Sequence, residues 1–479
     1  AMIPVYQIWV APNFFISLSA HAESSILFEF PEFSVLMPDD YLILTKDNTE
    51  KIKKRTKTVL GQMKKCGSIN QEEYDSAVAE VEAGFNFENG VKGNVYSSHT
   101  DALISQLIDQ IAAEKNISKT AAETYLNTSG LKIYSTQDVD IQKIMEDEMS
   151  ESRYILSGKD TSGNEIVAEA AAVIIEPSTG YVVGAVGQLG EKTTARGLNR
   201  INSPRQTGSS IKPLSDVLPG IEEGIITPAT IYLDTRTTFG GTWTPKNYNR
   251  YTGKRTVRSA LTTSQNIPFI KIQAELTPQK GIEYLKKMGV STLDDEKDNN
   301  LASVAIGGFT YGISPLEMAA AYAMISNDGV YIKPTFYTKA VDSNGNIVLE
   351  PNQPTERVCS VQTAYIVKDL MKSVVNDSAG TATYTRISGM DLAAKTGTTN
   401  EDKERWMCGF TNYYSCAVLY AFDEPRTITK SSKQSSGLIF ANIMKEIHSD
   451  RAIIVKVGQF YYCYGKDAIV LSYKYVSKK

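Results

Sequence analysis

The stretch that decides the fold is RQTGSSIKP, residues 205–213, where a glycine precedes a serine and a lysine follows three positions later. Gly208 allows the chain to turn sharply into a helix. Ser209 is therefore expected at a helix N-terminus, where unpaired N–H groups favour developing negative charge. Lys212, at i+3, would share a helix face with Ser209. The pattern predicts a serine nucleophile with a lysine beside it.

A serine nucleophile needs a base, and histidine is absent from this part of the sequence. The three histidines of the chain are His21, His99 and His448. A free lysine has a pKa of about 10.4, too high for a base at neutral pH. Burial and a second cation lower it, and Lys395 is the candidate for that cation. Neutral Lys212 would then take the Ser209 proton.

A second string, SQN at residues 264–266, follows an expected helix over Ser259–Thr263. A hydroxyl and an amide two positions apart in a tight turn can face one cavity. Ser264 is expected to relay a proton between Lys212 and the leaving group. Asn266 would hold either Lys212 or a substrate amide. Alone the string is weak, because serine and asparagine are common in surface turns.

A third string, KTGT, occupies residues 395–398 after a run that favours a strand. Lys395 and Thr396 are expected to hold a substrate carboxylate. Gly397 has no side chain, so a substrate backbone could lie close to the strand edge. The backbone N–H groups of Ser209 and Thr398 would together form an oxyanion hole.

The three strings together are much stronger evidence for one active site than any of them alone. They occur in one order, 55 (264−209) and 131 (395−264) residues apart. Penicillin-binding proteins and class A β-lactamases combine SxxK, a central serine-containing string and KTG in this way.

The chain resembles the transpeptidase domain of a class A penicillin-binding protein over roughly residues 166–450. Five further segments carry the resemblance: GLNR at 197–200, TPKNY at 244–248, VRSAL at 257–261, AIGG at 305–308 and GISPLEM at 312–318. Upstream, Lys53–Tyr74 resembles the tail of the glycosyltransferase module of these enzymes, and Gly130–Asp138 resembles the linker between the two modules.

Four segments follow from this resemblance. They are an unassigned N-terminal segment (1–50), a glycosyltransferase tail and linker (51–165), a transpeptidase domain (166–450) and a C-terminal extension (451–479). The catalytic body of a glycosyltransferase is not visible in the sequence, so no polymerase activity is predicted.

The expected fold class is α/β (α+β). Strand-like runs come early and late in the domain, with helical patterns between them, which predicts an antiparallel sheet assembled from both ends. The resemblance implies the fold shared by penicillin-binding proteins and serine β-lactamases, in which helices flank a central antiparallel sheet beside an all-α subdomain.

The resemblance also implies a reaction. Ser209 would attack the D-Ala-D-Ala carbonyl of a peptidoglycan stem peptide, and an amine of a second stem peptide would resolve the acyl-enzyme. β-Lactams would acylate the same serine. No metal and no organic cofactor would be needed. The expected place is the extracytoplasmic face of the bacterial cell membrane, with attachment through a segment outside this chain.

Three alternatives share the motifs. A serine β-lactamase needs a glutamate for deacylation, and EKDN at 296–299 imitates its E-x-x-N string, although within a very polar run. A D,D-carboxypeptidase would release the acyl group to water. A non-catalytic sensor would bind β-lactam or peptidoglycan without turnover.

The composition of the chain argues against several kinds of partner and site. The net charge of −4 argues against nucleic acid. No uninterrupted apolar run reaches the ~18 residues of a membrane-spanning helix. Five cysteines without a CxxC pair argue against a thiolate zinc site. Cys408 and Cys416 flank an expected hairpin turn, so they are either a cross-strand disulfide or two buried free thiols.

Overall fold

The structure is a computed structural model. It describes residues 6–9, 15–18, 49–83, 95–160, 162–428, 435–449, 453–457 and 460–464. The chain divides into two compact units. The first comprises Ala1–Tyr96, Ser118–Ala121 and Thr193–Ala195, and the second comprises Ser97–Ile117, Ala122–Lys192 and Arg196–Lys479.

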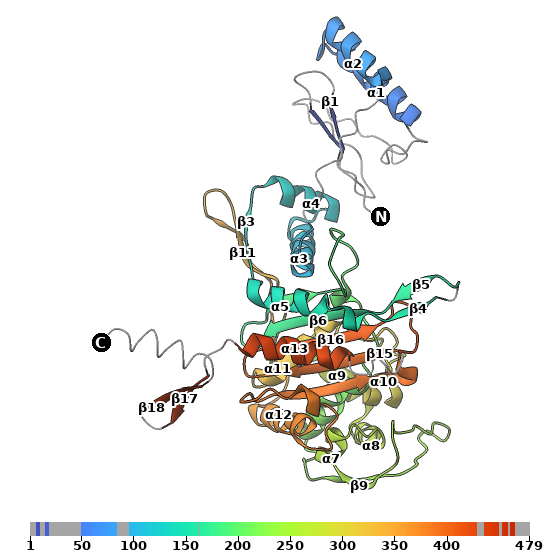
Figure 1. Ribbon diagram of the computed structural model, residues 1–479, viewed down its shortest axis with the longest axis vertical. Coiled ribbons are helices and arrows are strands. Elements are labelled where there is room, and N and C mark those ends of the chain that lie inside the picture. Colours follow the sequence, from blue (N-terminus) through green and yellow to red (C-terminus); the bar gives the residue numbers. More distant parts are fainter. Residues whose placement is uncertain are drawn as a thin grey trace. The chain divides into compact units, whose positions relative to one another are not determined.

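A five-stranded antiparallel sheet forms the centre of the second unit (Figure 1). Its order is β14-β15-β16-β6-β7. The strands are β6 (Glu169–Glu176), β7 (Tyr181–Val186), β14 (Ala393–Thr398), β15 (Glu404–Phe410) and β16 (Ser415–Ala421). Pairing of β6 with β16 joins the early and late parts of the domain. The predicted sheet, assembled from both ends, is thus confirmed.

Helices cover both faces of this sheet, as the alternation of side chains along β16 shows. The Ser415 hydroxyl donates to the carbonyl of Ala319 in α11 (Pro315–Ser326) at 2.7 Å. The Tyr420 hydroxyl, on the opposite face, donates to the carbonyl of Tyr154 at 2.8 Å. On that second face α13 (Ser435–Ser449) packs against α5 (Val139–Met149) and the sheet.

The register of the β15–β16 hairpin decides the state of its two cysteines. Cys408 lies opposite Ala417, and Cys416 lies opposite Gly409. Since neighbouring residues of a strand point to opposite faces, the two thiols lie on different faces of the sheet. Both are buried and free, so the disulfide alternative is wrong.

A helical subdomain packs beside the β14 edge and supplies most of the helices between the two halves of the sheet. It contains α6 (Leu218–Glu222), α7 (Val257–Thr262), α8 (Ile267–Leu276), α9 (Pro278–Lys287), α10 (Leu301–Ile306) and α12 (Val361–Asn376). α12 contacts both β14 and α7. Local sequence signals fix several starts, among them the capping box of Ser314 and Glu317 that opens α11.

The linker-like region begins the second unit. Apolar residues at helical spacing, among them Leu103, Leu107 and Ile111, predict a helix here and are buried in α3 (Ser98–Lys115). The sequence pattern over 139–149 predicts a second helix, which is α5. The run LKIYST at 131–136 predicts a strand, and the structure contains β3 (Lys132–Ser135), which pairs with β11 (Tyr337–Val341). The division into four segments remains a prediction.

The remaining elements are short or lie outside the sheet. They are β1 (Tyr6–Trp9), β2 (Phe15–Leu18), α1 (Thr49–Lys65), α2 (Gln71–Ala83), α4 (Lys119–Thr128), β4 (Ser157–Lys159), β5 (Glu165–Val167), β8 (Ile231–Asp234), β9 (Gly253–Thr256), β10 (Val330–Ile332), β12 (Ile347–Leu349), β13 (Thr355–Arg357), β17 (Ile453–Val457) and β18 (Phe460–Tyr464). No helix among the described residues is both long and apolar enough to cross a membrane.

Candidate active site

The segment that carries Ser209 is helical but irregular. Gly208–Ile211 forms a 3₁₀ turn, Pro213–Val217 a π-helical turn, and α6 follows. A 3₁₀ turn aligns residues i and i+3, so Ser209 and Lys212 lie along one line of the helix surface. Ser209 is half-buried, and its hydroxyl has no hydrogen-bond partner among the described residues.

Two glycines bring this segment against β14. A Cβ on Gly208, which has φ +52°, would lie 2.5 Å from the carbonyl oxygen of Thr398. A Cβ on Gly397 would lie 2.5 Å from the carbonyl oxygen of Thr207. The neighbour that requires glycine at 397 is therefore the protein's own backbone. This contact also brings together the segments of Ser209 and Thr398, as an oxyanion hole made from both would require.

The second string forms the C-terminal cap of α7. The N–H of Gln265 donates to the carbonyl of Ala260 at 3.0 Å, and the N–H of Ser264 donates to that of Leu261 at 3.1 Å. This is the Schellman pattern, which usually places glycine at the left-handed position. Here Ser264 occupies it with φ +58°. A serine in this conformation is strained by about 1–2 kcal/mol, and it presents its hydroxyl to the site.

Hydrogen bonds join the three strings into one cluster. The Lys212 ammonium donates to the carbonyls of Ser264 at 3.2 Å and Gln265 at 2.9 Å, and to Oδ1 of Asn266 at 2.8 Å. The Lys395 ammonium donates to Oγ of Ser264 at 2.8 Å and to the carbonyl of Thr396 at 2.9 Å. The structure thus brings Lys212, Ser264, Asn266 and Lys395 together.

Both lysines are fully buried, which controls their charge. Burial lowers the pKa of Lys212 to about 7, although the carboxyl of Asp216 opposes this shift. Burial, followed by the charge of Lys212, lowers the pKa of Lys395 well below its ordinary value. Repulsion between the ammonium groups therefore lowers the pKa of Lys395, whereas burial is what lowers that of Lys212.

Strand alternation separates the residues of the third string. Lys395 and Gly397 pair with Cys408 and Trp406 on the face that meets the Ser209 segment. Thr396 and Thr398 project to the other face of β14. The hydroxyls of Thr396 and Thr381 are 2.8 Å apart. The side chains of Lys395 and Thr396 therefore lie on opposite faces of β14. That both hold a substrate carboxylate remains a prediction.

Sequence reasoning missed Asp216, a fully buried carboxyl four residues after Lys212. Its Oδ1 has no hydrogen-bond partner among the described residues, and its pKa is raised well above the ordinary value by burial. Its spacing of i+4 from a candidate base was the available signal.

The string that imitates a β-lactamase glutamate lies in a surface turn. Glu296 is exposed, and its N–H donates to Oδ1 of Asp294 at 3.2 Å. The buried member of the string is Asp298, whose Oδ1 accepts from the backbone and hydroxyl of Thr310 at 2.7 and 2.8 Å. Among the described residues, no hydrogen bond or ion pair joins Glu296 to Ser209, Lys212 or Ser264.

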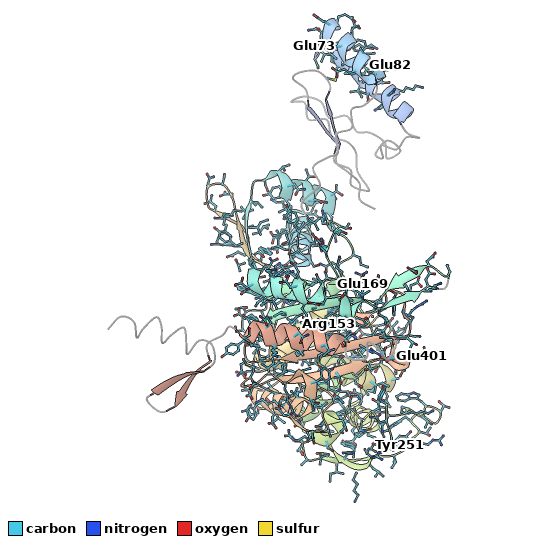
Figure 2. All side chains as sticks on the ribbon, viewed as in Figure 1. Glu73, Glu82, Arg153, Glu169, Tyr251 and Glu401 are labelled. Atoms are coloured by element: carbon cyan, nitrogen blue, oxygen red, sulfur yellow. The ribbon has the colours of Figure 1, made fainter. Side chains whose placement is uncertain are left out.

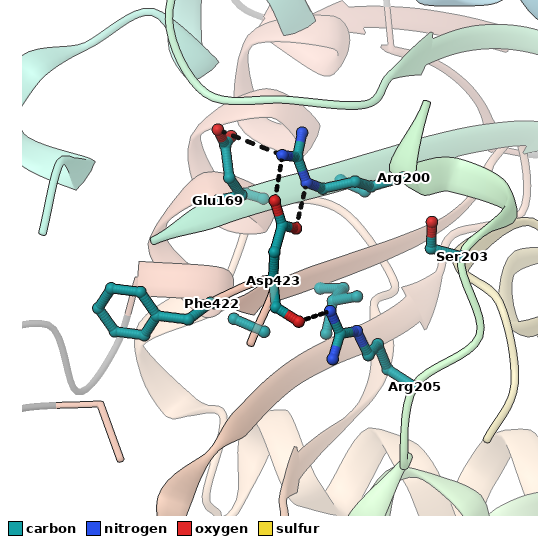
Figure 3. A pocket seen from close by; sticks show the side chains of 10 residues that line it. Glu169, Arg200, Ser203, Arg205, Phe422 and Asp423 are labelled. Atoms are coloured by element: carbon teal, nitrogen blue, oxygen red, sulfur yellow. Dashed lines mark hydrogen bonds and ion pairs between the residues drawn. The ribbon is translucent and has the colours of Figure 1, made fainter. Parts of the chain in front are cut away.

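A small pocket near the ends of β6 and β16 is lined by a cluster of ion pairs (Figure 3). Arg200 donates two hydrogen bonds to the carboxylate of Asp423, at 2.7 and 2.6 Å, and lies 3.5 Å from Glu169. Arg205 donates to the backbone carbonyl of Asp423. These contacts anchor the chain that leads into Ser209 to the adjoining ends of β6 and β16.

The fold and the cluster define the serine–lysine class that includes penicillin-binding proteins and serine β-lactamases. Residues 170–445 match the family model described as the penicillin binding protein transpeptidase domain. The chain belongs to the penicillin-binding protein transpeptidase family, as the sequence resemblance indicated.

Relatives extend the match over most of the chain. Penicillin-binding protein 1A of Clostridium acetobutylicum is 30% identical over 443 residues, covering 87% of this chain and 54% of the relative. Penicillin-binding protein 1F of Bacillus subtilis is 31% identical over 382 residues, covering 78% and 50%. The chain therefore spans about half the length of these relatives.

A solved structure agrees with the fold. PonA1 of Mycobacterium tuberculosis, determined in complex with penicillin V, superposes with a TM-score of 0.61 at 23% identity. The match covers 76% of this chain and 98% of that one.

Proposed function

We propose that this chain is a peptidoglycan D,D-transpeptidase that works through a Ser209 acyl-enzyme and is acylated by β-lactams. The observation that carries the proposal is the pair of buried lysines that meet at the turn of Ser264. A buried lysine with a pKa of about 7 is neutral in part of the population at neutral pH. That is the state a general base requires.

Acylation begins when neutral Lys212 accepts the Ser209 hydroxyl proton and Oγ attacks the carbonyl of the penultimate D-Ala. The backbone N–H groups of Ser209 and Thr398 would stabilise the oxyanion. The C–N bond then breaks, and the departing D-Ala nitrogen receives a proton. Ser264 is suited to deliver it, because its Oγ accepts from Lys395 and its own proton remains available. The proton that Lys212 took from Ser209 would then pass to Ser264, so that Ser264 is a hydroxyl again and Lys212 is neutral again when acylation ends.

Deacylation reverses these proton movements. An amine of a second stem peptide attacks the ester, loses a proton to the base, and forms the cross-link as Ser209 regains its hydrogen. Thr396 and Thr398, on the outer face of the β14 edge strand, would contact the donor strand or its terminal carboxylate. No step requires a metal or an organic cofactor. We place the reaction at the extracytoplasmic face of the bacterial membrane.

Product analysis tests the fate of the acyl group. A stem-peptide donor ending in D-Ala-D-Ala would be incubated with the chain and an acceptor amine, and the products separated by mass spectrometry. We expect D-Ala together with the cross-linked amide. Hydrolysed donor alone, at every acceptor concentration, would indicate a D,D-carboxypeptidase. Rapid release of bound penicillin would indicate a β-lactamase.

A further inference from the structure

The start of α8, next to the candidate active site, is capped in an unusual way. Asn266 occupies the N-cap position, where an asparagine side chain normally accepts a hydrogen bond from its own helix. Its side chain makes no such bond. Instead Oδ1 of Asn266 accepts from Lys212 at 2.8 Å, and Nδ2 donates to the carbonyl of Lys246 at 2.7 Å.

Another residue, Asn247, takes over the cap. Its Oδ1 accepts from the backbone N–H of Asn266 at 2.8 Å and of Ile267 at 3.4 Å. Backbone N–H groups only donate, so this contact fixes which end of the Asn247 amide faces α8. The Nδ2 end must then face away from the helix.

The far end of Asn247 is held by a buried carboxyl. Nδ2 donates to Oδ1 of Asp234 at 2.8 Å and, more weakly, to the carbonyl of Arg250 at 3.4 Å. The other oxygen of Asp234 accepts from the N–H and hydroxyl of Thr252 at 2.8 and 2.6 Å. Asp234 is fully buried and Asn247 is 8% exposed. Tyr251, the residue before Thr252, is labelled in Figure 2 and marks this part of the subdomain.

This arrangement supports a strained part of the site. Ser264, two residues before Asn266, holds a left-handed conformation that costs free energy. Such a conformation persists only when neighbouring contacts fix it. Asn247 fixes the backbone immediately after the turn, while its capping role leaves the Asn266 side chain available to Lys212.

We propose that Asn247, oriented by Asp234, is a positioning residue of the transpeptidase site: it caps α8 in place of Asn266 and thereby holds Asn266 against Lys212. The inference rests on the proposed function, because it assigns a consequence for acylation of Ser209. It does not depend on whether the acyl group later passes to an amine or to water.

An exchange of the two side chains tests the pairing. Asn247→Asp places two carboxyl groups against each other, and Asp234→Asn places two amide groups against each other. In the double variant, Asn at 234 can donate to Asp at 247, while Asp at 247 still accepts from Asn266. The rate constant for acylation by fluorescent penicillin would be measured against pH, with melting temperature recorded for every variant.

We expect each single variant to acylate about 100-fold more slowly, a typical effect of displacing a catalytic group by about 1 Å. The low-pH decline of the rate should also shift to lower pH, because loss of the Asn266 contact disfavours charged Lys212. The carboxyl of Asp216, which opposes the lowering of the Lys212 pKa by burial, and Lys395, whose own pKa is lowered by burial and by the charge of Lys212, are unchanged in these variants. The double variant should return to within about tenfold of the unmodified rate.

Controls separate positioning from folding. Asn346→Asp alters a similar asparagine–aspartate pair in the turn after β11, where Nδ2 of Asn346 donates to Asp342 at 3.0 Å. It should acylate normally. If Asn247→Asp does not fold, Asn247→Ala carries the same expectation without the added carboxyl.

The proposal is overturned if folded single variants acylate at the unmodified rate with an unchanged pH profile. It is also overturned if the double variant folds but acylates no faster than Asn247→Asp. A lack of labelling in the unmodified chain would instead contradict the proposed function itself.

Discussion

Replacing Ser209 with alanine should abolish covalent labelling by fluorescent penicillin. The hydroxyl is the one nucleophile that the SxxK string places beside a buried lysine at the β14 edge, and alanine leaves no atom to form the ester. Because Ser209 is half-buried and its hydroxyl makes no hydrogen bond among the described residues, the substitution should leave folding intact. Labelling on a gel, with intact mass as a second readout, measures the result.

The neighbouring serine is the matched control. The Ser210 hydroxyl donates to the carbonyl of Thr207 at 2.8 Å and is buried. Ser210→Ala should therefore remain labelled. Equal labelling of Ser209→Ala and the unmodified chain would exclude Ser209 as the nucleophile.

Replacing Lys212 with methionine should slow acylation at pH 7.5 by about 100- to 10,000-fold, the usual range for loss of a general base. Methionine keeps most of the buried volume of lysine, so the packing against Phe269 is largely retained. Stopped-flow or gel-based kinetics with the same penicillin would give the rate constant.

Lys368→Met is the matched control, because Lys368 is a half-buried lysine on α12 whose pKa is also lowered by burial. It should acylate at the unmodified rate. Acylation of Lys212→Met within about threefold of that rate would remove Lys212 as the base, since even a weak general base contributes more.

Much of the fold follows from local patterns in the sequence. Two β-like runs, Ala170–Ile175 and Tyr181–Val186, are joined by the turn-forming residues Glu176–Gly180 and predict the β6–β7 hairpin. The sequence pattern over Val139–Met149 predicts α5 with its observed bounds. The site strings could be assigned because each carries its own chemistry. That the strings meet in space, with Lys212 bonded to the turn of Ser264, could be seen only in the folded structure.

Other features depend on contacts that no local pattern records. The irregular helix after Gly208 and the requirement for glycine at 397 both arise from close packing of β14 on the Ser209 segment. The face of the sheet on which Cys408 lies depends on the register between β15 and β16. A shift of that register by one residue would move its side chain to the opposite face. Asn247 lies 19 residues from Asn266, and only the tertiary structure brings the two together.

The central claim is that a buried lysine replaces histidine as the base, and the pH dependence of acylation tests it most directly. Lys212 must be neutral to accept a proton, so the rate constant should be low near pH 5, rise through an inflection at about 7, and level off above it. His99 cannot produce this inflection, because burial lowers its pKa to about 4. His448→Gln should leave it in place. A rate constant that stays flat from about pH 5 to pH 9 would contradict the account.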